Sequence, residues 1–290
     1  MKIAGFTIIR NAIKFDYPVV ESINSILPIC DEFVVAVGKS DDETLQLIES
    51  INSPKIKIIK TIWDDNLREG GKVLADETNK AFDAISEEFD WCFYIQSDEI
   101  IHEKYLPVIK KRLTDLINDS DIEGILFNYN HFYGSYDYVA RSRKWYKKEI
   151  RIIRNNKEIR SYKDAQGFRK NGQKLKVKMV EASVFHYGWV KHPKEQQAKQ
   201  LSFNKMWHDN SWMENNIEKV DEFDYSNIDA LETFKGTHPK VMLPRIKNVN
   251  WSFSFNPTHR SISLKTRVLS FIETKLNYQF GEYKNYILIK

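Results

Sequence analysis

The short polar segment from Gln96 to Glu99 holds the residues best suited to chemistry. It reads Gln96-Ser97-Asp98-Glu99 and directly follows the apolar run Trp91 to Ile95. A carboxylate such as Asp98 can hold a divalent cation, and such a cation can bridge two phosphate groups. The alternative is that Asp98 and Glu99 only cap a following helix. The segment therefore predicts either a metal and phosphate site or a helix start.

Polar clusters also follow three other apolar runs that we expect to be strands. The runs are Ile3 to Ile9, Phe33 to Val37 and Ile56 to Ile62. The residues after them that we expect to contact a ligand are Arg10, Asn11, Asp42, Arg68 and Lys72. Ligands of open parallel sheets bind at the carboxyl ends of the strands. Four such clusters on one sheet edge predict a polar binding site there.

Apolar runs alternate with amphipathic segments over the first half of the chain. Apolar residues at helical spacing run from Val19 to Leu27, and a second helix face spans Leu74 to Ile85. A fifth apolar run spans Gly124 to Tyr129. Strands that alternate with helices form a mostly parallel sheet flanked by helices. We therefore expect an α/β fold, with soft boundaries near residues 130 and 210.

Four segments resemble motifs of the family 2 glycosyltransferases, which have the GT-A fold. These segments are, in order, Phe33 to Thr44, Arg68 to Lys72, Trp91 to Glu99 and His186 to Trp189. They resemble a strand with a Ser-x-Asp-Gly-Thr turn, an Asn-x-Gly turn, a strand ending in an Asp-x-Asp metal motif, and a late His-Tyr-Ser. The last is found in a bacterial branch that modifies lipopolysaccharide cores. The resemblance covers about residues 1–200.

The resemblance implies a GT-A-like domain over residues 1–210, followed by a helical C-terminal extension over residues 211–290. Within the domain, residues 1–130 would bind the nucleotide and residues 131–210 the acceptor. The implied activity is inverting, metal-assisted transfer of a sugar from a nucleoside-diphosphate sugar. The acceptor would be a glycan or a lipid-linked molecule in cell-surface polysaccharide assembly. Asp98 and His186 would hold Mn²⁺ or Mg²⁺, although His186 could equally be a hydrogen-bonded core histidine.

This sequence departs from the family pattern at two places. Gln96 replaces the first Asp of the metal motif, and its amide oxygen adds no charge. Val37 and Gly38 stand where the family usually has acids that bind the nucleobase. These departures support one alternative, a non-catalytic protein that binds nucleotide sugars. The other alternative, a sugar nucleotidyltransferase, is disfavoured because no Gly-rich phosphate loop follows the first strand.

Inversion needs a general base, and Asp164 stands where the related branch has a His-Glu pair. Neighbouring lysines and arginines would lower its pKa, and a structural salt bridge is the alternative role. Glu99 and Asp137 are the other candidate bases, and Glu99 could instead bind the acceptor. Arg151 and Arg154 lie on the strand-like Arg-Ile-Ile-Arg and could meet the donor phosphates. The alternative for these two arginines is a solvated basic face.

Composition restricts the partners and the location that we expect. The net charge of +4 is too small to imply nucleic acid by itself, and no nucleic-acid reading module accompanies it. Cys30 and Cys92 have no metal-type spacing, and we expect reduced core residues of a cytoplasmic protein. The N-terminus lacks the layout of a signal peptide. The basic segment from Arg141 to Lys178 and an amphipathic helix expected from Ser261 to Lys275 permit contact with anionic lipid at the inner face of the membrane.

Overall fold

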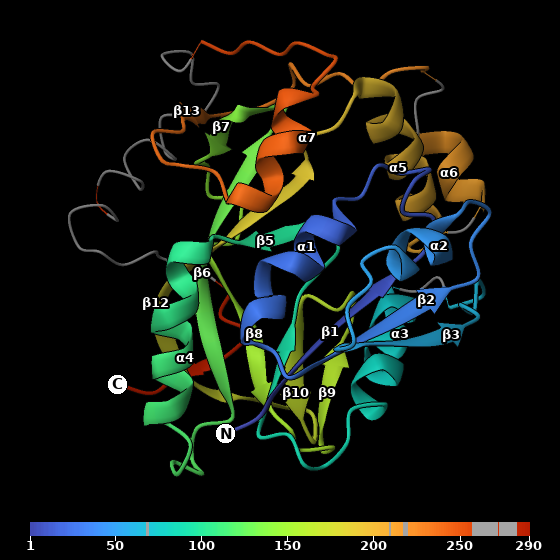
Figure 1. Cartoon of the computed structure of the whole chain (residues 1–290). Coiled ribbons are helices and arrows are strands. Elements are labelled where there is room, and N and C mark those ends of the chain that lie inside the picture. Colours follow the sequence, from blue (N-terminus) through green and yellow to red (C-terminus); the bar gives the residue numbers. More distant parts are fainter. Residues whose placement is uncertain (68–69, 209, 217–219, 257–271, 273–282) are drawn as a thin grey trace.

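A computed structural model gives the fold of the chain (Figure 1). It describes residues 1–67, 70–208, 210–216, 220–256, 272 and 283–290. Arg68 and nearly all of the helix expected from Ser261 to Lys275 lie outside these residues.

A large mixed sheet forms the centre of the molecule. Its strands are β1 (Ile3–Ile9), β2 (Glu32–Gly38), β3 (Ile56–Thr61), β4 (Trp91–Tyr94), β5 (Glu99–Ile101), β6 (Gly124–Tyr133), β7 (Ser135–Ala140), β8 (Lys148–Arg154), β12 (Lys176–Trp189), β13 (Leu231–Thr233) and β14 (Ile287–Leu288). A second, small sheet contains β9 (Ile159–Tyr162), β10 (Gly167–Lys170) and β11 (Gln173–Lys174).

The order along the main sheet is β13-β7-β6-β8-β4-β1-β2-β3, and β12 pairs with β5, β6 and β14. The segment β4-β1-β2-β3 is parallel throughout, as the strand and helix alternation predicts. Beyond β4, strand β8 runs antiparallel to its neighbours β4 and β6. The boundary expected near residue 130 falls inside β6, and residues after 211 add β13 and β14 to the same sheet.

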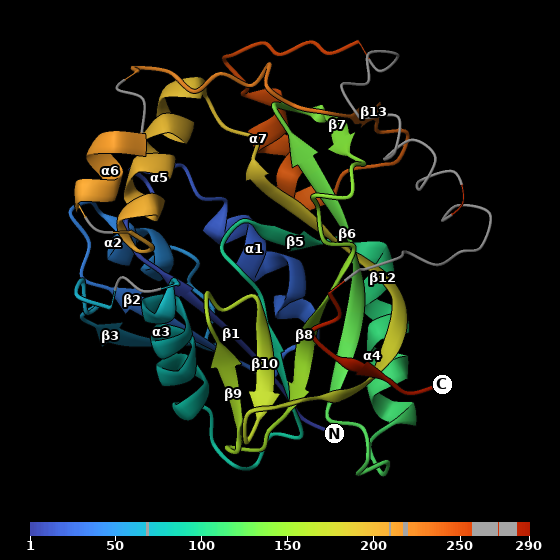
Figure 2. The same ribbon diagram turned by 180° about the vertical axis from the view of Figure 1, so that it is seen from behind.

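The described helices lie around this sheet. They are α1 (Val19–Ile26), α2 (Thr44–Glu49), α3 (Lys72–Asp83), α4 (Leu106–Asp115), α5 (Pro193–Lys205), α6 (Asn210–Asn216) and α7 (Leu243–Lys247). Short 3₁₀ turns are η1 (Leu27–Ile29), η2 (Glu103–Tyr105) and η3 (Lys240–Met242). In both views α5 and α6 lie together above α2, at the same end of the molecule (Figures 1 and 2).

Strands β1, β2 and β4 are buried on both faces, whereas β3 is partly exposed. The side chains of a strand alternate between the two faces. Phe33 and Val35 point to the face that α1 and α4 cover. Phe6 and Val34 point to the other face, which α3 and the small sheet cover (Figure 2). Every residue of β1 is buried. The expected α/β class, a sheet flanked by helices, is therefore confirmed, and both cysteines are buried and free.

Candidate active site

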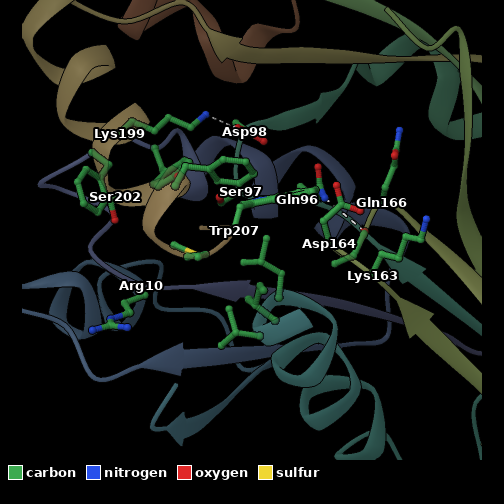
Figure 3. Close-up of a pocket in the computed structure, with 18 of the residues that line it drawn as sticks. Arg10, Gln96, Ser97, Asp98, Lys163, Asp164, Gln166, Lys199, Ser202 and Trp207 are labelled. Atoms are coloured by element: carbon green, nitrogen blue, oxygen red, sulfur yellow. Dashed lines mark hydrogen bonds and ion pairs between the residues drawn. The ribbon is translucent and has the colours of Figure 1, made fainter. Parts of the chain in front are cut away.

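One cavity of about 1290 Å³ lies where β1 and β4 end (Figure 3). The structure brings to it seven of the residues that the sequence singles out, from segments far apart in the chain. These are Arg10, Asn11, Gln96, Ser97, Asp98, Asp164 and His186. The parallel strands place their carboxyl ends side by side, which is the usual position of a ligand site in such a sheet.

The end of β1 is shaped by a left-handed residue. Asn11 has a φ of 56°, a conformation that asparagine tolerates better than most residues. Its side-chain oxygen accepts a hydrogen bond from the backbone of Asp41, and its own backbone N–H donates to Ser40 Oγ. Asn11 thus joins the turns that follow β1 and β2. The neighbouring Arg10 lines the cavity, and its Nη1 lies 2.7 Å from Oδ1 of Asp65.

Two other residues expected on this edge do not line the cavity. The carboxylate of Asp42 accepts hydrogen bonds from the backbone N–H groups of Lys14 and Thr44, at 2.8 and 3.0 Å. It therefore organises the turn before α2, and its neighbour Asp41 lines the cavity instead. Lys72 is exposed at the start of α3 and is also absent from the lining.

Asp98 lies at the cavity wall between a lysine and a histidine. The ammonium of Lys199, from α5, is 3.0 Å from Oδ2, and Nε2 of His186 is 3.6 Å from Oδ1. Burial would raise the pKa of Asp98, but the ammonium of Lys199 holds it well below its usual range. Burial also disfavours a charged Lys199, yet Asp98 raises the pKa of that lysine above its ordinary value. Both groups are therefore ionised.

His186 has a second partner behind the cavity wall. Its Nδ1 lies 3.0 Å from Nδ1 of His131, so one of the two rings must donate a proton to the other. Burial lowers the pKa of His186, although Asp98 opposes the change. Burial and the nearby His186 lower the pKa of His131 to about 3. Both rings are therefore neutral near pH 7, and each needs a defined tautomer.

The residues at Asp98 do not form a metal cage. Across the part of the chain that the structure describes, no three His, Cys, Asp or Glu side chains gather closely enough to hold a metal ion. The expected pair, Asp98 and His186, is present, but the third neighbour is a positively charged ammonium. A divalent cation is poorly suited to a position beside an ammonium group. The residues present do not fit the Mn²⁺ or Mg²⁺ that the motif predicts.

Asp164 is presented by a strained turn. Lys163 and Ala165, on either side of it, have φ angles of 54° and 60°. Nε2 of Gln96 donates to the carbonyl of Ala165 at 3.4 Å, so the end of β4 supports this turn (Figure 3). The expectation of a lowered pKa is wrong, because burial raises the pKa of Asp164 despite backbone hydrogen bonds and nearby cations. A raised pKa makes this carboxylate a stronger base.

Three charged residues expected to bind substrate are placed away from the cavity. Glu99 and Arg151 are fully buried and form an ion pair at 2.7 Å, and neither lines the cavity. Arg154 lies against the ring of Trp91, where β4 begins, and its guanidinium donates to backbone carbonyls there. The alternative base Asp137 is exposed and hydrogen-bonded to Ser135. These residues therefore contact other parts of the protein and do not line the cavity.

Three other lining residues carry little or no signal in the sequence. Lys199 carries no motif and reaches Asp98 across 101 positions of the chain. Glu149 lines the cavity with one buried carboxylate oxygen unpaired among the described residues. Trp63 directly follows the third apolar run, and this position at the end of a strand is a signal that it could line the site. Its indole N–H is likewise buried, and a Cβ at Gly38 would lie 2.4 Å from that nitrogen.

The absence of a side chain at residue 38 thus has a physical reason. Gly38 ends β2, and the indole of Trp63 occupies the space that any larger residue there would need. Where the resembled family has nucleobase-binding acids, this chain has an aromatic ring. The guanidinium of Arg10 lies 5.7 Å from the centre of that ring. This end of the cavity is therefore built from a different set of groups from the one that the resemblance implies.

Comparison with known proteins gave matches among solved structures only. No protein-family model matches the sequence, and no curated protein matches it. The structure of TarS from S. aureus is 16% identical, with a TM-score of 0.41 over 70% of this chain and 39% of TarS. TarS 1-349 with UDP-GlcNAc is 14% identical, with a TM-score of 0.41 over 76% of this chain and 68% of that one.

A third similar structure is glucosyl-3-phosphoglycerate synthase from Mycobacterium tuberculosis, solved with Mn²⁺, UDP and phosphoglyceric acid. It is 19% identical, with a TM-score of 0.30 over 46% of this chain and 43% of that chain. This chain thus spans less than half of the TarS chain and of the synthase chain. No helix in the described part of the chain is long and apolar enough to cross a membrane.

Proposed function

We propose that this protein is a glycosyltransferase that takes its sugar from a nucleoside-diphosphate donor. The observation that carries the proposal is the cavity at the ends of β1 and β4. It combines a buried, charged pair at Asp98 and Lys199 with a carboxylate of raised pKa at Asp164. Such a site offers one region for phosphate and another for proton removal.

The nucleoside end of the donor fits the region of Arg10 and Trp63. The guanidinium and the indole N–H both donate hydrogen bonds, and the ring offers a flat surface for a base. Asp41 and Asp65 line the same part of the cavity and can accept hydrogen bonds from a base or ribose. Among the described residues the buried indole N–H of Trp63 has no partner, and a buried donor without a partner is costly, which supports a ligand acceptor near this ring.

The chemistry that we propose is inversion at the anomeric carbon of the donor sugar. Asp164 removes the proton from an acceptor hydroxyl as that oxygen forms a bond to the anomeric carbon. The bond from this carbon to the phosphate oxygen breaks, and the nucleoside diphosphate leaves with the electron pair. Gln96, hydrogen-bonded to Ala165, holds the turn that carries Asp164.

The acceptor fits the aromatic side of the cavity. Trp145, Tyr146 and Trp189 line it, and the rings of Trp145 and Trp189 lie 5.8 Å apart. Aromatic faces with polar groups nearby are typical of sugar-binding surfaces. Together with the family resemblance, this supports a glycan or lipid-linked acceptor of cell-surface polysaccharide assembly. The basic segment from Arg141 to Lys178 would favour an acceptor held at an anionic membrane.

The test begins with thermal unfolding in the presence of a panel of nucleotide sugars, starting with UDP-GlcNAc. A ligand that binds only the folded state raises the melting temperature. We then expect slow hydrolysis of the donor that binds, measured as release of the nucleoside diphosphate. Binding without any turnover would support the non-catalytic alternative. Release of pyrophosphate from a nucleoside triphosphate and a sugar phosphate would support the nucleotidyltransferase.

A further inference from the structure

We propose that the ammonium of Lys199 supplies the positive charge that faces the donor diphosphate, so that donor binding and transfer proceed without a divalent cation. The proposal deepens the proposed function and rests on it, because it concerns the same cavity. It assigns to a lysine of α5 the task that the sequence motif assigns to a metal on Asp98. It predicts a reaction that is insensitive to chelators.

Three separate elements hold the ammonium in place. Nζ of Lys199 donates to Oδ2 of Asp98 at 3.0 Å and to the carbonyl of Gly188 at 2.9 Å. The same nitrogen lies 5.0 Å from the centre of the Tyr17 ring. The side chain is only 12% exposed, so its long stem is fixed by packing. Figure 3 shows the ion pair at the cavity wall.

The ammonium has capacity left for a ligand. A lysine ammonium has three N–H donors, and Asp98 and Gly188 take two of them among the described residues. Lys199 lines the cavity, so the remaining donor can meet a phosphate oxygen that enters it. The ion pair with Asp98 already offsets the free-energy cost of burying this ammonium. The ammonium is therefore in place before the donor binds.

The immediate surroundings leave little room for a metal ion on the same carboxylate. A Cβ at Gly188 would lie 2.6 Å from Nε2 of His186 and 2.7 Å from Oδ2 of Asp98. The backbone of β12 thus passes directly beside both expected ligands. The ammonium of Lys199 contacts the same oxygen, Oδ2, at 3.0 Å. Asp98 then has a different function from the one that the motif predicts. It holds the ammonium of Lys199 in place and favours its charged form.

The decisive measurement compares donor binding and turnover in EDTA with the same quantities in added Mn²⁺. We expect UDP to bind the unaltered chain in EDTA, as measured by calorimetry. Hydrolysis or transfer rates should agree within about twofold between the two conditions, a difference well below one order of magnitude in rate. Lys199→Met should lower the rate in EDTA by about 10²-fold or more, the usual cost of one preorganised donor to a developing charge.

Two further variants separate the charge from the fold. Lys199→Arg keeps the charge and should retain part of the activity in EDTA. Lys194→Met changes an exposed lysine of the same helix, and we expect parent-like rates and affinity. A thermal melt shows whether Lys199→Met is folded. If Lys199→Met is not folded, the rates of the unaltered chain and of Lys199→Arg in EDTA and in Mn²⁺ still test whether the reaction needs a divalent cation.

The possible failures are distinguishable. If EDTA abolishes turnover and Mn²⁺ restores it, the inference about Lys199 is overturned and the proposed function stands. If folded Lys199→Met matches the parent in EDTA, the inference is overturned in the same way. If no nucleotide sugar binds or is hydrolysed under either condition, the proposed function fails, and the inference that rests on it fails too.

Discussion

The carboxylate of Glu99 and the guanidinium of Arg151 form a two-pronged ion pair in which both side chains are fully buried. Nε and Nη2 of Arg151 each donate to one carboxylate oxygen at 2.7 Å. The hydroxyl of Tyr129 donates to the same carboxylate at 2.8 Å. Nη1 of Arg151 donates to the carbonyl of Gln166, two residues after Asp164, at 2.9 Å. The pair therefore supports the turn that carries the candidate base.

Arg151→Met should destabilise the fold strongly. It leaves the carboxylate of Glu99 buried without its partner, and breaking a buried pair from one side typically costs about 3–5 kcal/mol. Asp83→Asn is the matched control, because it breaks an exposed ion pair with Arg160, and such pairs contribute about 0–1 kcal/mol. Urea unfolding measures both. A loss below about 1 kcal/mol in Arg151→Met would contradict the structural role of the pair.

Asp164→Asn tests the candidate base. The change is nearly isosteric, but an amide cannot accept the hydroxyl proton, and loss of a general base typically costs about 10²- to 10⁴-fold in rate. Donor affinity should stay within about threefold of the parent, less than 1 kcal/mol. Transfer rates and donor calorimetry measure the two quantities. A collapse of donor affinity would place Asp164 in the binding site, and unchanged transfer would make Glu149 the next candidate.

Gly71→Ala should disturb the candidate base through a direct collision. Gly71 has a φ of 71°, and a Cβ there would lie 2.9 Å from Cβ of Asp164. Gly70 is the matched control, because its φ is 61° and a Cβ there would have nothing within 4 Å. Both alanines bear a left-handed backbone that costs about 1–2 kcal/mol. Only Gly71→Ala should also lower the transfer rate, and equal rates in the two variants would contradict this contact.

The fold and the core of the site could be predicted because their signals are local. Apolar runs and helical spacing lie within a few neighbouring residues, and a strand end fixes where Gln96 to Asp98 must point. The choice between Asp41 and Asp42 could not be predicted in this way. It depends on which of the two carboxylates accepts hydrogen bonds from the backbone N–H groups of Lys14 and Thr44.

The errors at charged residues have a different cause. Because charged side chains are rarely buried, the sequence predicts that Glu99 and Arg151 contact a ligand. No local pattern shows that the two side chains are buried against each other. Lys199 illustrates the opposite case, because its partner Asp98 is distant in sequence and only the fold brings α5 to β4. The sequence shows the cations near Asp164, which favour a lowered pKa, but it cannot show the burial that raises this pKa.

Glu149 should make the stability of the fold depend on pH. Burial raises the pKa of this carboxyl from 4.5 to about 8, although Arg151 opposes the change. Between these two values the folded chain holds a proton that the unfolded chain has released. Stability therefore falls as the pH rises through this window, and it levels off above the higher value. Below pH 4.5, both states are protonated and the contribution is fully present.

Glu149→Gln removes the titrating group and keeps the shape of the protonated acid. We therefore expect the melting temperature of this variant to fall less steeply than that of the parent between pH about 5 and about 8. Above the window the variant should be the more stable protein, because it never has to bury a charge. Glu158→Gln, a change of an exposed acid in the same basic segment, should keep the steep dependence of the parent. Parallel curves for the parent and Glu149→Gln across this range would show that Glu149 is ionised in the folded chain. In that case Glu149, which lines the cavity, would be a second carboxylate near Asp164, and the double variant with Asp164→Asn would be the one to assay for transfer.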